Sequence, residues 1–254
     1  MKKLIIYDGS CPMCRLYTKG MIAADCNSSL TRLSSEEVVQ ETVLNRLDRQ
    51  RARHEIPLVD LDGGETLYGI DTWTYVFGRR SHSIEKLLSF RWLRVILQKL
   101  YAFISYNRRI IITSAPGRWQ LLDLQPDFRL GYRLAFILLV FGLVSALFFI
   151  PGGSTWPITI LITGQITVAA LSIWLAKRSD FLVTLMDYTG HLGMTLLIGG
   201  LFMWTSYILS WPTFISIGYT LMIGQHFIRC YRLGLDPWLS VWFTGLVMSL
   251  FYPL

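Results

Sequence analysis

The chain has 254 residues, a net charge of +7 and a hydrophobic share of 52%, which is too apolar for an ordinary water-soluble protein. The charge is unevenly distributed, because residues 1–129 hold 19 of the 24 lysines and arginines and 14 of the 17 acidic residues. This division excludes a single soluble domain and predicts a charged first half followed by a membrane-embedded second half.

Two cysteines stand where the first expected strand gives way to the first expected helix. Lys3–Tyr7 is an apolar run typical of a buried strand, and a helix is expected from Cys11 to about Ala24. Cys11 and Cys14 are three residues apart, so they lie on one face of that helix at a spacing that permits a disulfide. The unpaired amides of a helix N-terminus stabilise a thiolate, which predicts a lowered pKa for Cys11 and makes it the nucleophile.

The remaining elements of the first half alternate between strands and helices. In chain order we expect a strand at Leu30–Leu33, a helix from Ser34 or Ser35 to Arg49, a polar connection over 50–55, strands at Ile56–Leu61 and Glu65–Tyr68, a helix at Ile70–Phe77 and a longer helix from Ser83 to about Tyr106. Asp62-Gly63-Gly64 is a turn signal of the kind that joins antiparallel strands. This order, with a Cys-x-x-Cys motif after the first strand, is typical of a thioredoxin-like α/β sheet.

The motif Asp8-Gly9-Ser10-Cys11-Pro12-Met13-Cys14 resembles the Asp-x-x-Cys-x-x-Cys signature of the DCC family of thiol-disulfide oxidoreductases. Later segments resemble the same family: Ile56–Asp60 with the Asp62-Gly63 turn, Tyr68–Asp71, and Tyr106-Asn107-Arg108. Thr72 departs from the pattern, which favours a small residue such as alanine there. The resemblance covers about residues 3–110, and it implies a thioredoxin-like fold and a thiol–disulfide reaction but no particular substrate.

The cysteine pair and three neighbours form the expected site. In the expected reaction Cys11 attacks a disulfide, a mixed disulfide forms and Cys14 resolves it, without a dissociable cofactor. A structural zinc site is the less favoured alternative, because it needs four ligands and the sequence has no second Cys-x-x-Cys or histidine pair. Asp8 is either a turn or helix-capping carboxylate or the acceptor of the Cys14 proton. Pro57 is either an ordinary edge-strand proline or the cis proline of thioredoxin-like proteins, which would offer the amide and carbonyl of Ile56 to an extended substrate.

Five nearly charge-free segments of the second half approach the length that crosses a bilayer. They are 132–150, 156–176, 190–210, 212–229 and 237–252, and the last two are the shortest. The expected organisation is therefore a thioredoxin-like domain at 1–112, a juxtamembrane linker at 113–131 and an all-α bundle of about five transmembrane helices at 132–254.

Basic residues flank these segments in alternate connections, which predicts that those connections are cytoplasmic. The residues are Arg129, Arg133, Lys177, Arg178, Arg229 and Arg232, whereas Pro151–Thr155 and Ser210-Trp211-Pro212 carry no charge. The first half is then cytoplasmic and Leu254 extracytoplasmic. Lys2 and Lys3 precede only four apolar residues, too few for a signal peptide, so we expect the cysteine pair in a reducing compartment, where such pairs are more often catalytic than structural.

The membrane half contains a few polar side chains that could carry function. Asp187 and His191 are one helical turn apart and are expected to pair, although these two and His226 are also candidates for a quinone, proton or substrate site. Cys230, beside Arg229, is either an ordinary buried thiol or a relay that exchanges with Cys11. Glycines at 199, 200, 218 and 224 are expected to allow close helix packing.

The basic and apolar stretch Arg91–Lys99, followed by Arg108, Arg109 and Arg118, is expected to cover the sheet and to present cations to an anionic membrane surface rather than to nucleic acid. We therefore expect a multi-pass, membrane-anchored thiol-disulfide oxidoreductase that faces the cytoplasm and acts on a protein or small-molecule thiol or disulfide. The alternative is a non-catalytic redox-sensing or docking domain of a membrane assembly or transporter.

Overall fold

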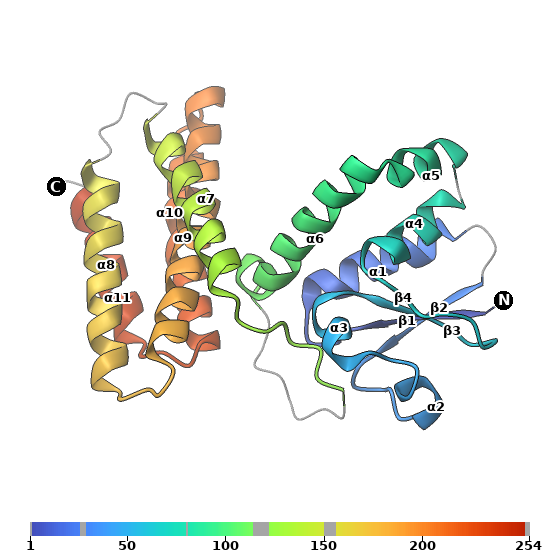
Figure 1. The fold of residues 1–254 in the computed structure, drawn as a ribbon. Coiled ribbons are helices and arrows are strands. Elements are labelled where there is room, and N and C mark those ends of the chain that lie inside the picture. Colours follow the sequence, from blue (N-terminus) through green and yellow to red (C-terminus); the bar gives the residue numbers. More distant parts are fainter. Residues whose placement is uncertain (1, 26–28, 80, 114–121, 150–155, 252–254) are drawn as a thin grey trace. The chain divides into compact units, whose positions relative to one another are not determined.

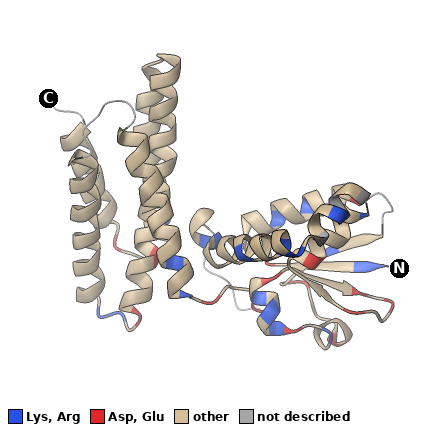
Figure 2. Ribbon diagram, turned by 45° about the horizontal axis from the view of Figure 1, so that its top comes forward, with Lys and Arg blue, Asp and Glu red and all other residues tan. Residues whose placement is uncertain are grey.

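The computed structural model describes residues 2–25, 29–79, 81–113, 122–149 and 156–251, so Cys26, Arg118, Pro151–Thr155 and Leu254 lie outside the described residues. The chain forms two compact units, Met1–Arg129 and Leu130–Leu254 (Figure 1). Charged residues concentrate in the first unit, as expected (Figure 2). The first unit extends beyond the expected boundary at residue 112, because residues 122–129, which we expected in a linker, belong to it.

A four-stranded mixed sheet in the order β2-β1-β3-β4 forms the centre of the first unit. The strands are β1 (Lys3–Tyr7), β2 (Leu30–Ser34), β3 (Pro57–Asp60) and β4 (Leu67–Tyr68). β1 is parallel to β2 and antiparallel to β3, and β3 is antiparallel to β4. The expected strands and hairpin are thus confirmed, and Gly63 in the turn has φ +105°, a conformation that glycine adopts without a steric penalty.

Helices cover both faces of this sheet (Figure 1). They are α1 (Pro12–Ala24), α2 (Glu41–Leu44), α3 (Arg49–His54), α4 (Ile70–Gly78), α5 (His82–Ser89) and α6 (Arg91–Ile111). Because side chains alternate along a strand, Ile5 of β1 packs against α1 and α4, whereas Leu4 and Ile6 pack against α2 and α3. Leu122 and Leu124 join this second layer, which explains why residues 122–129 are part of the unit.

The single helix expected between residue 34 and Arg49 is wrong. The chain instead forms two short helices, α2 and α3, and the second lies where we expected a polar connection. Asp48 caps α3, because its carboxylate accepts hydrogen bonds from the amides of Gln50 and Arg51, both at 3.0 Å. Val38, Val43 and Leu47 are buried against the sheet, and a bent path lets all of them reach it.

The helix expected from Ser83 to Tyr106 is also two helices. Phe90 adopts an extended conformation and separates α5 from α6. The α6 helix then continues beyond Tyr106 to Ile111, which carries Arg108 and Arg109 on its last turns.

The second unit is an all-α bundle, and three of its helices are long and apolar enough to span a membrane. These are α7 (Leu130–Phe149), α8 (Trp156–Leu175) and α9 (Phe181–Leu209). They are followed by α10 (Thr213–Arg232) and the shorter α11 (Trp238–Phe251). The described residues therefore contain three candidate spans where we expected about five segments. The third span begins at Phe181, nine residues earlier than expected, and so includes Asp187.

The α9 and α10 helices pack closely through two glycines. A Cβ atom at Gly199 would lie 2.9 Å from the carbonyl oxygen of Gly218, and a Cβ at Gly218 would lie 2.8 Å from that of Gly199. Both contacts are shorter than backbone atoms tolerate, so the expected packing role of these residues is confirmed. The expectation for Gly224 is wrong, because a Cβ there would meet no described atom within 4 Å.

Candidate functional site

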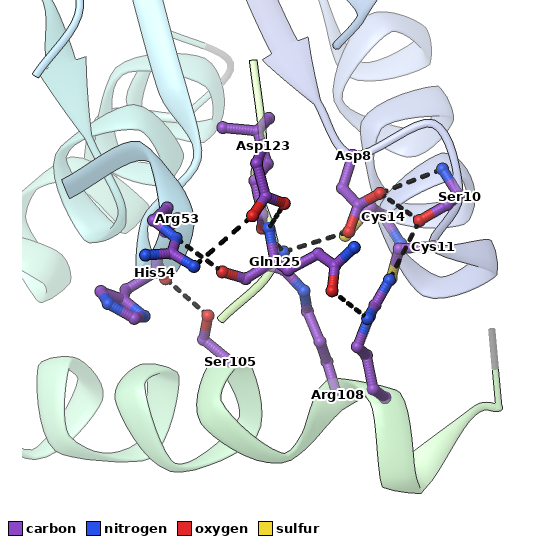
Figure 3. Close-up of polar contacts among 12 residues, drawn as sticks. Asp8, Ser10, Cys11, Cys14, Arg53, His54, Ser105, Arg108, Asp123 and Gln125 are labelled. Carbon is purple, nitrogen blue, oxygen red and sulfur yellow. Dashed lines mark hydrogen bonds and ion pairs between the residues drawn. The ribbon is translucent and has the colours of Figure 1, made fainter. Parts of the chain in front are cut away.

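The two cysteines lie at the point where β1 leads into α1 (Figure 3). Cys11 is the N-cap of α1, and its Sγ accepts a hydrogen bond of 3.4 Å from the amide of Cys14. Pro12 occupies the first turn, where its missing N–H costs no helical hydrogen bond. Both residues are free thiols with exposed fractions of 0% for Cys11 and 1% for Cys14.

The two thiols have opposite acidities. The pKa of Cys11 is lowered to about 7, first by a hydrogen bond from the Cys14 side chain and then by the positive charge of Arg108, which together outweigh burial and the charge of Asp8. The pKa of Cys14 is raised, first by its hydrogen bond to Cys11 and then by burial. Cys11 is therefore the more acidic thiol of the pair. The direction of its pKa shift agrees with the prediction, but the largest cause is the Cys14 side chain rather than the amides of the helix N-terminus.

A buried arginine from the end of α6 pairs with Asp8. The Nη2 atom of Arg108 lies 3.3 Å from Oδ2 of Asp8, and it also donates to the carbonyl oxygen of Leu124. The other carboxylate oxygen of Asp8 accepts hydrogen bonds from the amide of Ser10 at 3.0 Å and from its hydroxyl at 2.6 Å. Both oxygens of Asp8 are thus engaged, which favours the turn-forming role over that of a proton acceptor for Cys14.

Arg109 connects the same turn to residues 122–129. It donates a 2.6 Å hydrogen bond to the side-chain oxygen of Gln125 and a 3.4 Å hydrogen bond to the hydroxyl of Ser10. Burial lowers the pKa of Arg109, but a guanidinium remains charged at neutral pH. Two cations and a returning segment of chain therefore surround the loop that carries Cys11.

The α3 helix holds the other end of residues 122–129. Arg53 lies 2.7 Å from a carboxylate oxygen of Asp127 and donates a 2.9 Å hydrogen bond to the carbonyl oxygen of Gln125. His54 contacts Asp127 at 2.9 Å, and burial lowers the pKa of His54. These contacts fix the segment over the sheet, and they give His54 a structural partner away from the thiols.

The substrate-binding role expected for Ile56 and Pro57 is not supported by the local geometry. The structure contains no cis peptide bond among its described residues, so the cis conformation expected for Pro57 is wrong. The amide of Ile56 donates to the hydroxyl of Tyr101 at 2.9 Å, and its carbonyl accepts hydrogen bonds from the amide of Gly69 and the hydroxyl of Thr72. The backbone that was expected to receive a substrate is therefore already paired within the domain, and Thr72 contributes to that pairing.

A polar network lies inside the second unit, with one side chain from each of four helices. The amide of Gln165 donates to the Tyr188 hydroxyl at 2.7 Å, which lies 2.9 Å from Nε2 of His226. The other ring nitrogen of His226 lies 2.9 Å from the hydroxyl of Ser240. All four side chains are buried. A network with these partners fixes how α8, α9, α10 and α11 pack against one another.

One ion pair and one hydrogen bond to an arginine join helices of the same bundle and correct an expectation. Asp187 pairs with Arg133 of α7 at 3.2 Å, and Nδ1 of His191 lies 2.9 Å from a guanidinium nitrogen of Arg229. Asp187 and His191 thus have cationic partners on other helices, and the expected mutual pair is wrong. Arg133 and Arg229 lie in the terminal turns of α7 and α10, but their side chains are buried against other helices.

Cys230 is buried on the inner face of α10, where its Sγ lies 3.6 Å from Nδ1 of His226. Cys11 and Cys14 are buried to the same extent, so burial by itself does not distinguish Cys230 from the proposed reactive pair. The relay expected for Cys230 stays a prediction, and the mechanism proposed below uses only Cys11 and Cys14.

Sequence reasoning missed Arg108 and Arg109 as site residues, because it treated them as cations for a membrane surface. An adjacent arginine pair at the end of a largely apolar helix was the available signal, but their partners Asp8 and Gln125 are distant in the sequence. No protein-family model, no curated protein and no solved structure matches this chain.

Proposed function

We propose that the protein is a membrane-anchored thiol-disulfide oxidoreductase whose reactive group is the Cys11–Cys14 pair. The observation that carries the proposal is the contrast between the two thiols, since Cys11 has a pKa of about 7 at a helix N-terminus and Cys14 stays protonated beside it. An exchange enzyme needs this division of roles, because the first thiol must attack as a thiolate and the second must stay protonated until the mixed disulfide has formed.

The proposed reaction transfers two electrons from the dithiol to a substrate disulfide. The Cys11 thiolate attacks one sulfur, so the substrate S–S bond breaks, a mixed disulfide forms and the first substrate thiolate departs with the Cys14 proton. The Cys14 thiolate then attacks Cys11, the mixed disulfide breaks, and the second substrate thiolate takes a proton from water. The protein ends as the Cys11–Cys14 disulfide and the substrate as two thiols, and every step is reversible.

Two structural proposals accompany this function. The mixed sheet with the Cys-x-x-Cys motif after β1 and helices on both faces supports a thioredoxin-like fold for the first unit. The buried network that ties α10 and α11 to α8 and α9 supports five membrane-spanning helices. The 14 residues of α11 are short for a bilayer, so this helix would span only with local thinning of the membrane.

Glutathione disulfide tests the proposed division of roles in the full-length protein. In Cys14→Ser, a stable mixed disulfide with glutathione should accumulate on Cys11, because the resolving thiol is gone. Wild-type protein should instead form the Cys11–Cys14 disulfide, and Cys11→Ser should form no comparable adduct. Peptide mapping by mass spectrometry separates these products from adducts on Cys26 or Cys230. Equal modification of Cys11 and Cys14 in the wild type would contradict the proposed roles.

The alternative function is a redox-sensing or docking domain of a membrane assembly or transporter. The burial of both thiols favours it, because an enclosed dithiol holds its redox state until the domain opens. Turnover separates the two functions. An oxidoreductase should consume many equivalents of glutathione disulfide when dithiothreitol regenerates the dithiol, whereas a sensor should react once and stop.

The proposed membrane topology has its own test. Arg129, Lys177, Arg178 and Arg232 lie at helix ends on alternate connections, and the buried Arg133 and Arg229 lie in the adjoining terminal turns. With five spans and these connections in the cytoplasm, a reporter fused after Leu254 should be extracytoplasmic. A cytoplasmic reporter would mean that α10 or α11 does not cross the membrane.

A further inference from the structure

The α6 helix faces the first unit with a polar row. Arg94, Tyr101, Ser105 and Arg108 lie along one side of the helix, and each binds the domain. Arg94 pairs with Asp71, Tyr101 accepts from the amide of Ile56, Ser105 donates to the carbonyl oxygen of His54 at 2.5 Å, and Arg108 binds Asp8 and Leu124. These contacts fix which side of α6 is turned inward.

The opposite side of α6 carries a row of exposed apolar residues. Trp92, Ile96, Leu100 and Ile104 follow one another at intervals of four residues, and their exposed fractions are 64%, 53%, 50% and 39%. Val95 lies beside this row with 49% exposed. A surface helix of a soluble domain has the reverse arrangement, with apolar residues inside and polar residues outside. We call these five residues the outer face of α6.

The outer face differs from the other exposed apolar residues of the described first unit. Leu16 lies on α1, Val39 and Leu61 lie in separate connections, and isolated residues of this kind are common on protein surfaces. Leu87, Phe90 and Ile112 are also exposed, but they lie on α5 or at the two ends of α6 and form no row of their own. A continuous apolar row along three turns of one helix is uncommon on a protein surface, and it marks an interaction surface.

The charge of α6 identifies the partner. The helix contains no acidic residue. Of its five basic residues, Arg94, Arg108 and Arg109 bind within the first unit, whereas Arg91 and Lys99 are exposed next to the outer face. Apolar side chains flanked by exposed cations, with a tryptophan in the row, are the pattern of helices that lie in the interface of an anionic membrane. Because the chain also contains candidate membrane spans, a bilayer is always present near this domain.

We propose that the outer face of α6 inserts into the boundary between headgroups and acyl chains of an anionic leaflet. Arg91 and Lys99 then bind lipid phosphates, and the apolar row enters the edge of the hydrocarbon. Since the inner row of the same helix ends at Arg108 beside Asp8, this docking holds the Cys11 turn close to the membrane surface. The proposal concerns only where the domain lies, and it does not depend on the redox function.

Photolabelling with lipid tests this docking in the full-length protein. The protein is reconstituted into phosphatidylcholine vesicles containing roughly a third phosphatidylglycerol and a trace of a phospholipid with a diazirine in its acyl chain, because docking needs anionic lipid. After illumination, adducts should appear in the peptide that holds residues 92–104 as well as in the spans. Replacing the phosphatidylglycerol by phosphatidylcholine should lower the yield of adducts on this peptide, because the leaflet no longer attracts the cations. Arg91→Gln/Lys99→Gln should also lower it, by about fivefold for each cation removed.

Matched variants separate docking from general effects. Ile96→Gln/Leu100→Gln should remove the adducts on residues 92–104. Leu16→Gln/Val39→Gln, which changes apolar residues elsewhere that are even more exposed, should leave the adducts unchanged. Lys19→Gln/Arg49→Gln makes the same charge change as Arg91→Gln/Lys99→Gln at other exposed sites and should have little effect. The proposal is overturned if residues 92–104 remain unlabelled in anionic vesicles, or if crosslinking shows the outer face against a second copy or against the second unit.

Discussion

Arg108→Met should destabilise the first unit by about 3 kcal/mol, because it leaves the buried carboxylate of Asp8 without its cation. It also removes the donor to the carbonyl oxygen of Leu124, so the hold on residues 122–129 weakens. Urea titration of the full-length protein with pulse proteolysis, scored by cleavage within residues 1–129, measures this loss directly.

Two further variants identify the cause of the loss. Asp8→Asn/Arg108→Met removes the uncompensated charge together with its partner and should recover most of the stability. Arg109→Met, which changes a less buried neighbour with hydrogen bonds to Ser10 and Gln125, should cost clearly less than Arg108→Met. If the double variant is no more stable than Arg108→Met alone, the pair with Asp8 is not the reason for the loss.

Cys11 should react with iodoacetamide half-maximally near pH 7, whereas Cys14 should stay unreactive up to at least pH 9. The rate of alkylation at each cysteine, followed by peptide mass spectrometry between pH 5 and 9, gives both values. In Arg108→Met the midpoint for Cys11 should move to higher pH, because the cation that stabilises its thiolate is gone and the charge of Asp8 is unscreened. Indistinguishable profiles for the two thiols would contradict the assignment of nucleophile and resolving residue.

The same acidities should make the stability of the first unit depend on pH. The pKa of Cys11 is lower in the folded protein than its ordinary value of 9.0, so the folded state binds fewer protons between about pH 7 and 9 and its stability rises over that interval. This contribution, on the order of 2 kcal/mol, is complete above pH 9 and is lost as the pH falls through 7. The raised pKa of Cys14 acts in the opposite sense, because its stabilisation is present below pH 9 and is lost as the pH rises above that value.

The two contributions together predict a maximum of stability near pH 9. Urea midpoints of the wild type and Cys11→Ser, measured at each pH under identical conditions, isolate the contribution of Cys11. The rise between pH 7 and 9 should be present in the wild type and absent in the variant. A rise of the same size in Cys11→Ser would assign the effect to other groups.

The sequence by itself determined the elements whose signals are local. The apolar run at Lys3–Tyr7, the turn at Asp62-Gly63-Gly64 and the position of Cys11 at the start of a helix were all predicted, because alternation, turn chemistry and capping act within a few residues. The division of the chain near residue 130 followed from composition for the same reason, since the absence of charge is a property of each segment alone.

Local signals failed where burial against distant residues decided the path of the chain. Ser34 or Ser35 with following glutamates predicted one helix. Val38, Val43 and Leu47 are instead buried against the sheet, and the chain bends so that all three reach it. In the same way, residues 122–129 have the composition of a linker. They belong to the domain because Leu122 and Leu124 reach the core and Arg53 holds Asp127.

Only the tertiary structure decided which charged and polar side chains contact one another. Asp8 and Arg108 are 100 residues apart, and Tyr188 and His226 are 38 residues apart on different helices, so no local pattern relates them. Burying a charged or polar group is costly unless a partner satisfies it, and the partner is whichever side chain the packing brings within reach. The sequence therefore determined where the thiols stand and which half enters the membrane, while the packing of distant elements decided that Arg108 lies beside the thiols and that α6 turns its apolar row outward.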